Sequence, residues 1–183
     1  MSIKISYSNK ASTKSPTNLI LFTDENFHID DLKKHISNVE FSYIKDLLKN
    51  SDLKKNLLFF EINSKKTIFL ISVKKNLKPS DIESLGAEFH SYINYNKNSE
   101  YSVNSDSINN KFEIFLGHFL HGLKLKSYEF NIYKTKKETK NILVNVTGNI
   151  KKTTIQNELR FKAIEEGTFF ARDLVSEPPN VLN

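Results

Sequence analysis

The sequence contains no cysteine, only five glycines, and no motif in which glycines cluster. Without cysteine the chain has no disulfide framework, no thiolate zinc ligand and no cysteine nucleophile. A phosphate-cradling loop usually needs clustered glycine, because its backbone N–H groups must reach the ligand unhindered. No P-loop, GxGxxG or GxSxG motif occurs, which argues against a nucleotide or ADP-ribose pocket.

Long apolar runs are also missing. The N-terminal stretch MSIKISYSNKASTKSP is polar and alternating, so it lacks the apolar core that a signal peptide needs. No other run approaches the roughly 20 apolar residues of a membrane-spanning helix. Together with the absence of cysteine, this predicts a soluble, cytoplasmic protein with no membrane partner.

Apolar residues are nevertheless plentiful enough for a packed core. Hydrophobic residues make up 38% of the 183 positions and charged residues 26%, with fourteen Phe and seven Tyr. Aromatic side chains bury large areas each, and this composition is not that of a disordered chain. The length suits one domain, or one domain plus the start of another.

The spacing of apolar residues predicts alternating strands and helices. Alternating or short continuous apolar runs indicate strands at 3–7, 19–22, 56–62, 67–73, 101–103 and 141–147. Helical spacing indicates helices at 39–48, 79–93, 112–123 and 161–175. Residues 10–17 resemble a polar linker, 24–38 are ambiguous, 63–66 form the turn of an antiparallel hairpin, and 128–133 suggest an extended segment.

Several helix ends and faces can be assigned. Ser80 and Glu83 have the spacing of a capping box at the start of the second helix, and Gly122 lies near the end of the third. Pro178-Pro179 stops the last helix. The apolar face of that helix is expected to consist of Phe161, Ile164, Thr168, Ala171 and Val175.

The order of these elements predicts the fold class. Strands and helices interleave and include one hairpin, which indicates an α/β domain with a mixed sheet flanked by helices on both faces. The expected architecture is a three-layer sandwich. The sequence shows no internal repeat.

The five histidines do not form a metal motif. His118 and His121 are three residues apart on one predicted helix, whereas an HExxH zinc helix needs a spacing of four and a glutamate. Both lie outside the apolar arc of that helix, so we expect them to be exposed. His28, His35 and His90 have no ligand-spaced partner. We assign no catalytic and no metal-ligating residue.

The net charge of +6 is concentrated in one segment. Residues 124–152 hold eight lysines against two glutamates, so the rest of the chain is balanced. A basic patch can attract a phosphate backbone, but lysine lacks the bidentate fork of arginine. A solvated surface is one interpretation, and weak DNA binding is the other. The candidate nucleic-acid-binding residues are Lys124, Lys126, Lys134, Lys136, Lys137 and Lys140.

Two stretches resemble the N-terminal domain of leucyl (cytosol) aminopeptidases. The first is 122–135 (GLKLKSYEFNIYKT), and the second is 165–182 (EEGTFFARDLVSEPPNVL), which is similar to the junction leading into the catalytic domain of that family. Ser176 and Glu177 depart from the usual Asn and Thr. The matching motif residues with a structural role are Gly122, Tyr128, Phe130, Tyr133, Lys134, Arg172, Asp173, Pro178, Pro179 and Asn180.

The resemblance implies a domain plan and a parent activity. It implies a macro-domain-like domain over 1–150, a linking helix over 151–177, and the start of a missing catalytic domain at 178–183. The parent would be a two-metal hydrolase using manganese or zinc, assembled as a hexamer, with its ligands in the catalytic domain. This chain alone is expected to be inactive and to hold no cofactor. Its partners would be that catalytic domain and copies of itself.

Three function classes therefore stay open at the level of sequence. The first is an assembly or regulatory domain of a metallo-aminopeptidase that removes N-terminal residues from peptides. The second is a nucleic-acid-binding module that uses the basic segment 124–152. The third is a ligand-binding module of macro type.

Overall fold

The computed structural model describes residues 2–8, 18–95, 99–108, 114–135, 140–148 and 152–178. The predicted linker at 10–17 lies outside these ranges, as do the first two residues of the helix predicted at 112–123 and four residues named above: Lys136, Lys137, Pro179 and Asn180.

Strands of the described residues form one sheet. They are β1 (Ser2–Ser8), β2 (Asn18–Asp24), β3 (Leu57–Asn63), β4 (Lys66–Val73), β5 (Glu100–Asn104) and β6 (Asn141–Thr147), in the order β1-β6-β5-β2-β4-β3. All neighbouring pairs are parallel except β3 and β4, which form an antiparallel hairpin. The predicted mixed sheet and its hairpin are confirmed.

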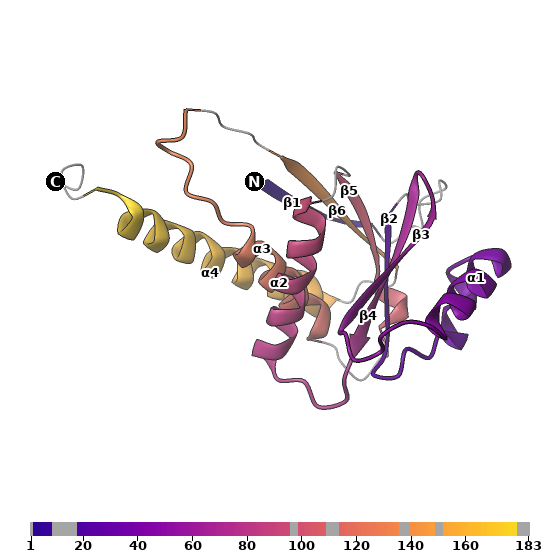
Figure 1. Cartoon of the computed structure of the whole chain (residues 1–183). Helices are drawn as coiled ribbons and strands as arrows, with labels where there is room; N and C mark the ends of the chain where they lie inside the picture. The colour runs from indigo at the N-terminus through magenta and orange to yellow at the C-terminus, as the bar shows by residue number, and fades with distance from the viewer. Residues whose placement is uncertain are drawn as a thin grey trace.

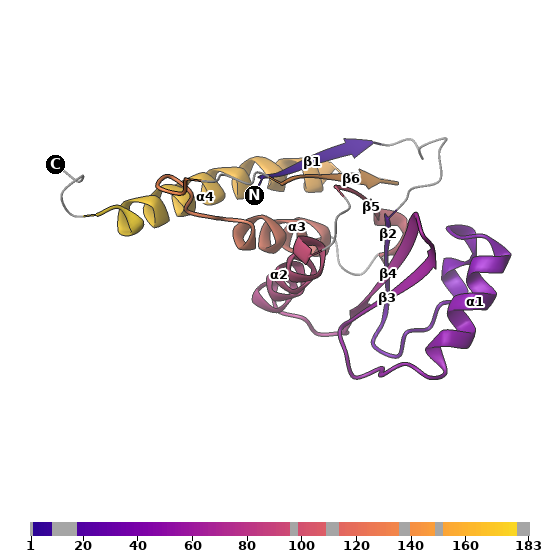
Figure 2. The ribbon, with the colours of Figure 1, turned by 45° about the horizontal axis from the view of Figure 1, so that its top comes forward.

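Helices cover both faces of this sheet, as Figures 1 and 2 show. One face carries α2 (Pro79–Tyr95) and α3 (Phe115–Lys126), and the other carries α1 (Asn38–Leu48) with the short 3₁₀ helix η1 (Asp30–Lys34). A second 3₁₀ helix, η2 (Ser105–Ser107), follows β5, and the long α4 (Lys152–Ser176) packs on α3. The three-layer α/β architecture is confirmed, and η1 accounts for part of the ambiguous stretch 24–38.

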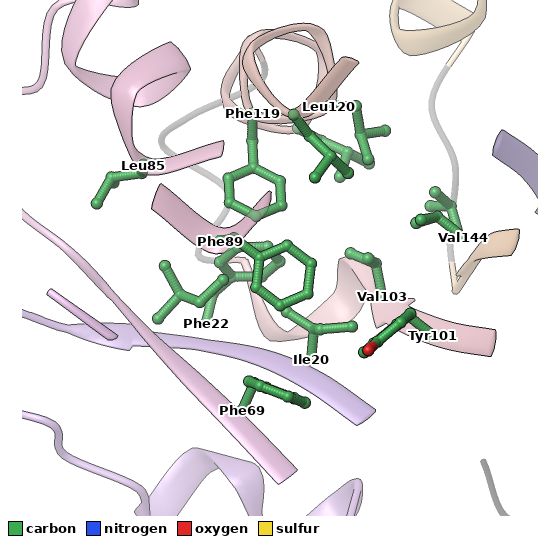
Figure 3. Close-up of a cluster of buried hydrophobic side chains, with 14 of the residues drawn as sticks. Ile20, Phe22, Phe69, Leu85, Phe89, Tyr101, Val103, Phe119, Leu120 and Val144 are labelled. Carbon is green, nitrogen blue, oxygen red and sulfur yellow. The ribbon is translucent and has the colours of Figure 1, made fainter. Parts of the chain in front are cut away.

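The alternation of side chains along the central strands divides the core in two. In β2, Ile20 and Phe22 point into the cluster beneath α2 and α3, while Leu19 and Leu21 point into the cluster beneath α1. A strand covered on both faces has to be apolar at consecutive positions. The larger cluster is rich in aromatic rings that meet edge to face, for example Phe69 against Phe89 at 5.5 Å (Figure 3).

The two S-x-x-E sequences at helix starts behave differently. Ser37 and Glu40 form a complete capping box at the start of α1, with both reciprocal bonds present. The box predicted at Ser80 is wrong, because Pro79 begins α2 and Ser80 lies inside its first turn. The backbone N–H of Lys78 donates instead to Asp81 Oδ2 at 3.0 Å.

Residues 128–133, expected to be extended, belong to no helix or strand and include a turn at 132–133. The last helix differs from the sequence interpretation. The expected apolar face of α4 is only partly its packed face, since Val175 is 88% exposed and Ile164 is 43% exposed. The helix turns Glu165 inward, with 6% of that residue exposed, because α3 presents polar partners to it.

Candidate functional site

The two motifs that resemble leucyl aminopeptidases meet in space. The Tyr128 hydroxyl, from the segment after α3, donates a hydrogen bond to Asp173 Oδ1 of α4 at 2.7 Å. The Tyr128 ring also lies 5.4 Å from that of Phe169. Further along, the Tyr133 hydroxyl donates to the Glu177 carboxylate. We call Tyr128, Tyr133, Arg172, Asp173 and Glu177 the tyrosine clamp.

Arg172 joins the clamp to the end of α3. Its guanidinium donates to the Leu125 carbonyl oxygen at 2.8 Å and lies 5.4 Å from the centre of the Tyr128 ring. A cation at the last carbonyls of a helix is favoured by the helix dipole. Burial and the bond to Asp173 raise the pKa of Tyr128, so its hydroxyl stays a donor. The clamp therefore fixes α4 to the domain through the motif residues.

The other motif residues have structural surroundings as well. The Phe130 ring packs 5.8 Å from that of Tyr133, Lys134 is exposed, and Pro178 follows the end of α4. Gly122 does not end its helix, since α3 continues to Lys126. Its role is close packing on α2, because a Cβ at Gly122 would lie 2.0 Å from the Glu83 carbonyl oxygen.

A buried polar seam joins α3 to the middle of α4. His121 Nδ1 lies 2.9 Å from Glu165 Oε1, and both side chains are at least nine-tenths buried. Lys124 Nζ stands 3.7 Å from the second oxygen of the same carboxylate. The ring of Phe161 stacks on His121 at 4.5 Å. A buried carboxylate needs such partners, because desolvation penalises the charged form.

The expectation that His118 and His121 are exposed is therefore wrong. His121 is 5% exposed, and His118 Nδ1 pairs with Glu83 Oε1 at 2.7 Å while its ring meets Phe161. The helical wheel correctly placed both outside the apolar arc. It could not show that α4 covers this side of α3.

The predicted nucleic-acid-binding lysines do not share one environment. Lys124 belongs to the seam, and Lys140 Nζ donates to the carbonyl oxygens of Ile93 and Asn94 at 2.7 and 3.1 Å. Burial lowers the pKa of Lys140. Lys126 and Lys134 are exposed. Nucleic-acid binding through this segment stays a prediction. Two of its lysines, Lys124 and Lys140, already contact groups of the protein.

A groove of about 590 Å³ lies between α2, α3 and α4. Its lining includes Ser84 and Arg172, which donate to the backbone carbonyls of Ser80 and Leu125, both at 2.8 Å. The Arg172 bond joins α4 to α3, and the Ser84 bond stays within α2, so both groups already have partners in the protein. We interpret the groove as a packing gap at the edge of the clamp rather than a built ligand site.

Two hydrogen bonds lie near the point where the strand order reverses, between the carboxyl ends of β2 and β5. Such a switch point is where open α/β sheets commonly bind ligands. Here the Phe22 N–H donates to Ser107 Oγ at 3.0 Å, and Asn104 Nδ2 lies 3.0 Å from His35 Nδ1. Binding of a macro-type ligand at this point stays a prediction.

The described ranges contain neither a metal-binding cluster nor a membrane-spanning helix. Within them, no three His, Asp or Glu side chains come together as a metal site. None of the helices in this part of the chain combines the length and apolar character needed to cross a bilayer.

Comparison with known proteins gives matches by structure alone. No family model and no curated protein matches the sequence. A tomato leucine aminopeptidase mutant matches over 98% of this chain and 39% of its own, with a TM-score of 0.72 and 16% identity. The bottromycin maturation enzyme BotP, in complex with Mn, matches over 92% of this chain and 33% of its own, with a TM-score of 0.63 and 8% identity. A second BotP structure gives a TM-score of 0.65 at 10% identity, over 92% of this chain and 34% of its own.

These matches show the fold that this chain shares with other proteins. The chain has the α/β fold found in one part of larger enzymes, and it spans well under half of their length. The particular likeness is to leucine aminopeptidase, the family that the motifs around Tyr128 and Arg172 resemble. Fold and motifs thus agree.

Proposed function

We propose that this chain is the non-catalytic N-terminal domain of a two-metal aminopeptidase of the leucyl type. The observation that carries the proposal is the match that covers 98% of this chain but only 39% of the tomato enzyme. A fold by itself does not carry function. The additional support is that the two motifs resembling the family form the tyrosine clamp, which holds α4.

The parent activity in this proposal is removal of N-terminal residues from peptides. A two-metal site needs several hard donors in one cleft to bind the ions and activate water. We place those donors, and the manganese or zinc they would hold, in a catalytic domain after residue 183. The role of this chain would then be to support assembly, as a homo-oligomer such as a hexamer, or to regulate the enzyme in the cytoplasm.

The test is hydrolysis of leucine p-nitroanilide with added manganese or zinc. We expect no metal-dependent turnover by the purified chain and clear turnover by the protein encoded when the reading frame continues beyond Asn183. The longer protein serves as the positive control for metal loading and substrate. Turnover by the pure chain would show that it carries its own site, and an inactive longer protein would remove the assigned parent activity.

A further inference from the structure

The side of α4 that faces away from α3 is apolar. At about 100° per residue, residues 163–175 present only apolar side chains or glycine over an arc of about 140°. Phe170 at 65% and Val175 at 88% are the most exposed large apolar side chains of these residues. We define the α4 outer face as Ala163, Ile164, Gly167, Phe170, Ala171, Leu174 and Val175. One turn earlier, the exposed Arg160 lies on the same side and marks the end of the apolar face.

A face of this kind is unusual for a solvated helix. Single exposed apolar residues are ordinary, but contiguous apolar patches of several hundred Å² mark contact surfaces. On the opposite side of the helix, Phe161, Glu165 and Phe169 already pack against α3 and the tyrosine clamp. The packed side of α4 therefore combines two aromatic rings with buried polar groups, whereas the apolar outer side is not covered by the described part of this domain.

We propose that the α4 outer face docks on the domain that follows residue 183, so that α4 is packed between two domains and is no free linker. This inference rests on the proposed function, because it requires a longer protein. The match to the tomato enzyme runs over 98% of this chain, and hence through α4, while most of that enzyme lies outside the matched part. The tomato enzyme therefore contains a helix that corresponds to α4, together with further residues that could pack on it.

Position along the chain favours the same occupant. Phe170, Leu174 and Val175 lie in the last two turns of α4, next to the point where the chain continues. Figure 1 shows this half of the helix extending beyond the sheet toward the C-terminus. A domain tethered there meets the face at a high effective concentration.

The face is also held in a fixed orientation before any docking. The seam at His121 and Glu165 fixes the middle of α4, and the Tyr128–Asp173 bond fixes its last turn. A preorganised surface loses less conformational entropy on association. Along its middle, Ala163, Gly167 and Ala171 recur every four residues and leave room for bulky side chains from the partner; a Cβ at Gly167 would touch nothing within 4 Å.

These 183 residues contain no cysteine, so an introduced thiol can be labelled in the chain, and in the longer protein the labelled peptide identifies the position. We would compare the Val175→Cys variant with a matched control, Val39→Cys, whose valine is 80% exposed on α1 in the opposite layer. Labelling by a maleimide at each position would be followed by mass spectrometry, in the 183-residue chain and in the longer protein.

We expect both thiols to react at similar rates in the 183-residue chain. In the longer protein, the thiol at position 175 should react about tenfold or more slowly, since it reacts only when the contact opens, while the rate at position 39 is unchanged. Equal rates at position 175 in the two proteins would overturn the proposal, as would a reading frame that ends at Asn183. Protection that appears in the short chain and grows with its concentration would assign the face to a second copy instead.

The outcomes separate this inference from the proposed function. An active longer protein with an unprotected position 175 would leave the peptidase assignment standing and remove the docking surface. If position 175 is protected in a longer protein that has no peptidase activity, the docking surface stands and the peptidase assignment is removed.

Discussion

Two helical glycines, Gly122 and Gly167, have opposite surroundings. A Cβ at Gly122 would meet the Glu83 carbonyl oxygen at 2.0 Å, and one at Gly86 would meet the Phe119 carbonyl oxygen at the same distance. Helices α2 and α3 therefore touch backbone to backbone at their crossing. At Gly167 the space is open, so nothing in this domain requires a glycine there.

This contrast predicts opposite effects of alanine. Gly122→Ala forces α2 and α3 apart, and overpacking of this kind costs about 1–3 kcal/mol or more in the free energy of unfolding. Gly167→Ala should raise that free energy by about 0.5–1 kcal/mol, because alanine loses less backbone entropy in a helix. Urea unfolding of both variants beside the parent chain measures the difference. A Gly122→Ala variant as stable as the parent would contradict the close crossing.

For single residues, the sequence identified positions with a structural role, but it did not reveal the contacts that give them that role. Gly122 was singled out by the motif, but its reason is the backbone of α2, which no local pattern reveals. His121 was expected to be exposed because a helical wheel contains only its own helix. Its burial depends on Glu165 and Phe161, which arrive from a helix much later in the chain.

At the scale of elements, the start of α1 shows how a local signal becomes part of the packing. Ser37 and Glu40 close the capping box, and the Glu40 carboxylate also pairs with Lys66 Nζ at 2.5 Å. Lys66 is the first residue of β4. The cap therefore links α1 to the sheet as well as satisfying the end of the helix.

The two S-x-x-E sequences give a matched test of capping. Ser37→Ala should lower the free energy of unfolding by about 1 kcal/mol, the usual contribution of an N-cap side chain. Ser80→Ala should change it by no more than a few tenths of a kcal/mol, since Ser80 lies within the helix and alanine is a good helix former. Thermal or urea unfolding would compare them directly. Equal losses in the two variants would restore the box predicted at Ser80.

Elements with strong periodicity were predictable, and those set by tertiary contacts were not. The strands at 19–22 and 67–73 and the helix bearing Ile82 and Phe89 were predicted because burial on defined faces dictates their patterns. The packed face of α4 was misassigned because its buried side carries Glu165, which pairs with His121, while much of its apolar side is exposed. Periodicity alone selects the more apolar side of a helix and cannot show that polar partners on α3 cover the other one.

For the molecule as a whole, the histidines make stability depend on pH. Burial lowers the pKa of His35 and of His90 below the usual 6.5. Their Nε2 atoms are buried without a hydrogen-bond partner. The exposed His28 is the opposite case, since its bond to Asp24 raises its pKa.

We expect the free energy of unfolding to fall as the pH drops from about 6.5 toward the lowered pKa values of His35 and His90, because the unfolded chain binds those protons more readily. His28 opposes this trend, since its contribution is present at low pH and disappears as the pH rises through its raised pKa. Urea midpoints between pH 5 and 8 measure the slope. His90→Gln should flatten it, whereas the control His28→Gln should steepen it. A parent slope of zero or of opposite sign would contradict the assigned burial.

The pairing of β1 with β6 has a consequence for the order in which the chain folds. β1 is the first strand of the chain, but its partner in the described sheet is the last strand, with Ser2 opposite Asn141 and Ser8 opposite Thr147. Contacts so distant in sequence carry a large loop-closure entropy and form slowly. A chain that emerges from the ribosome N-terminus first must therefore hold β1 without its sheet neighbour until almost the whole domain has been made. The first strand synthesised is the last that can join the sheet.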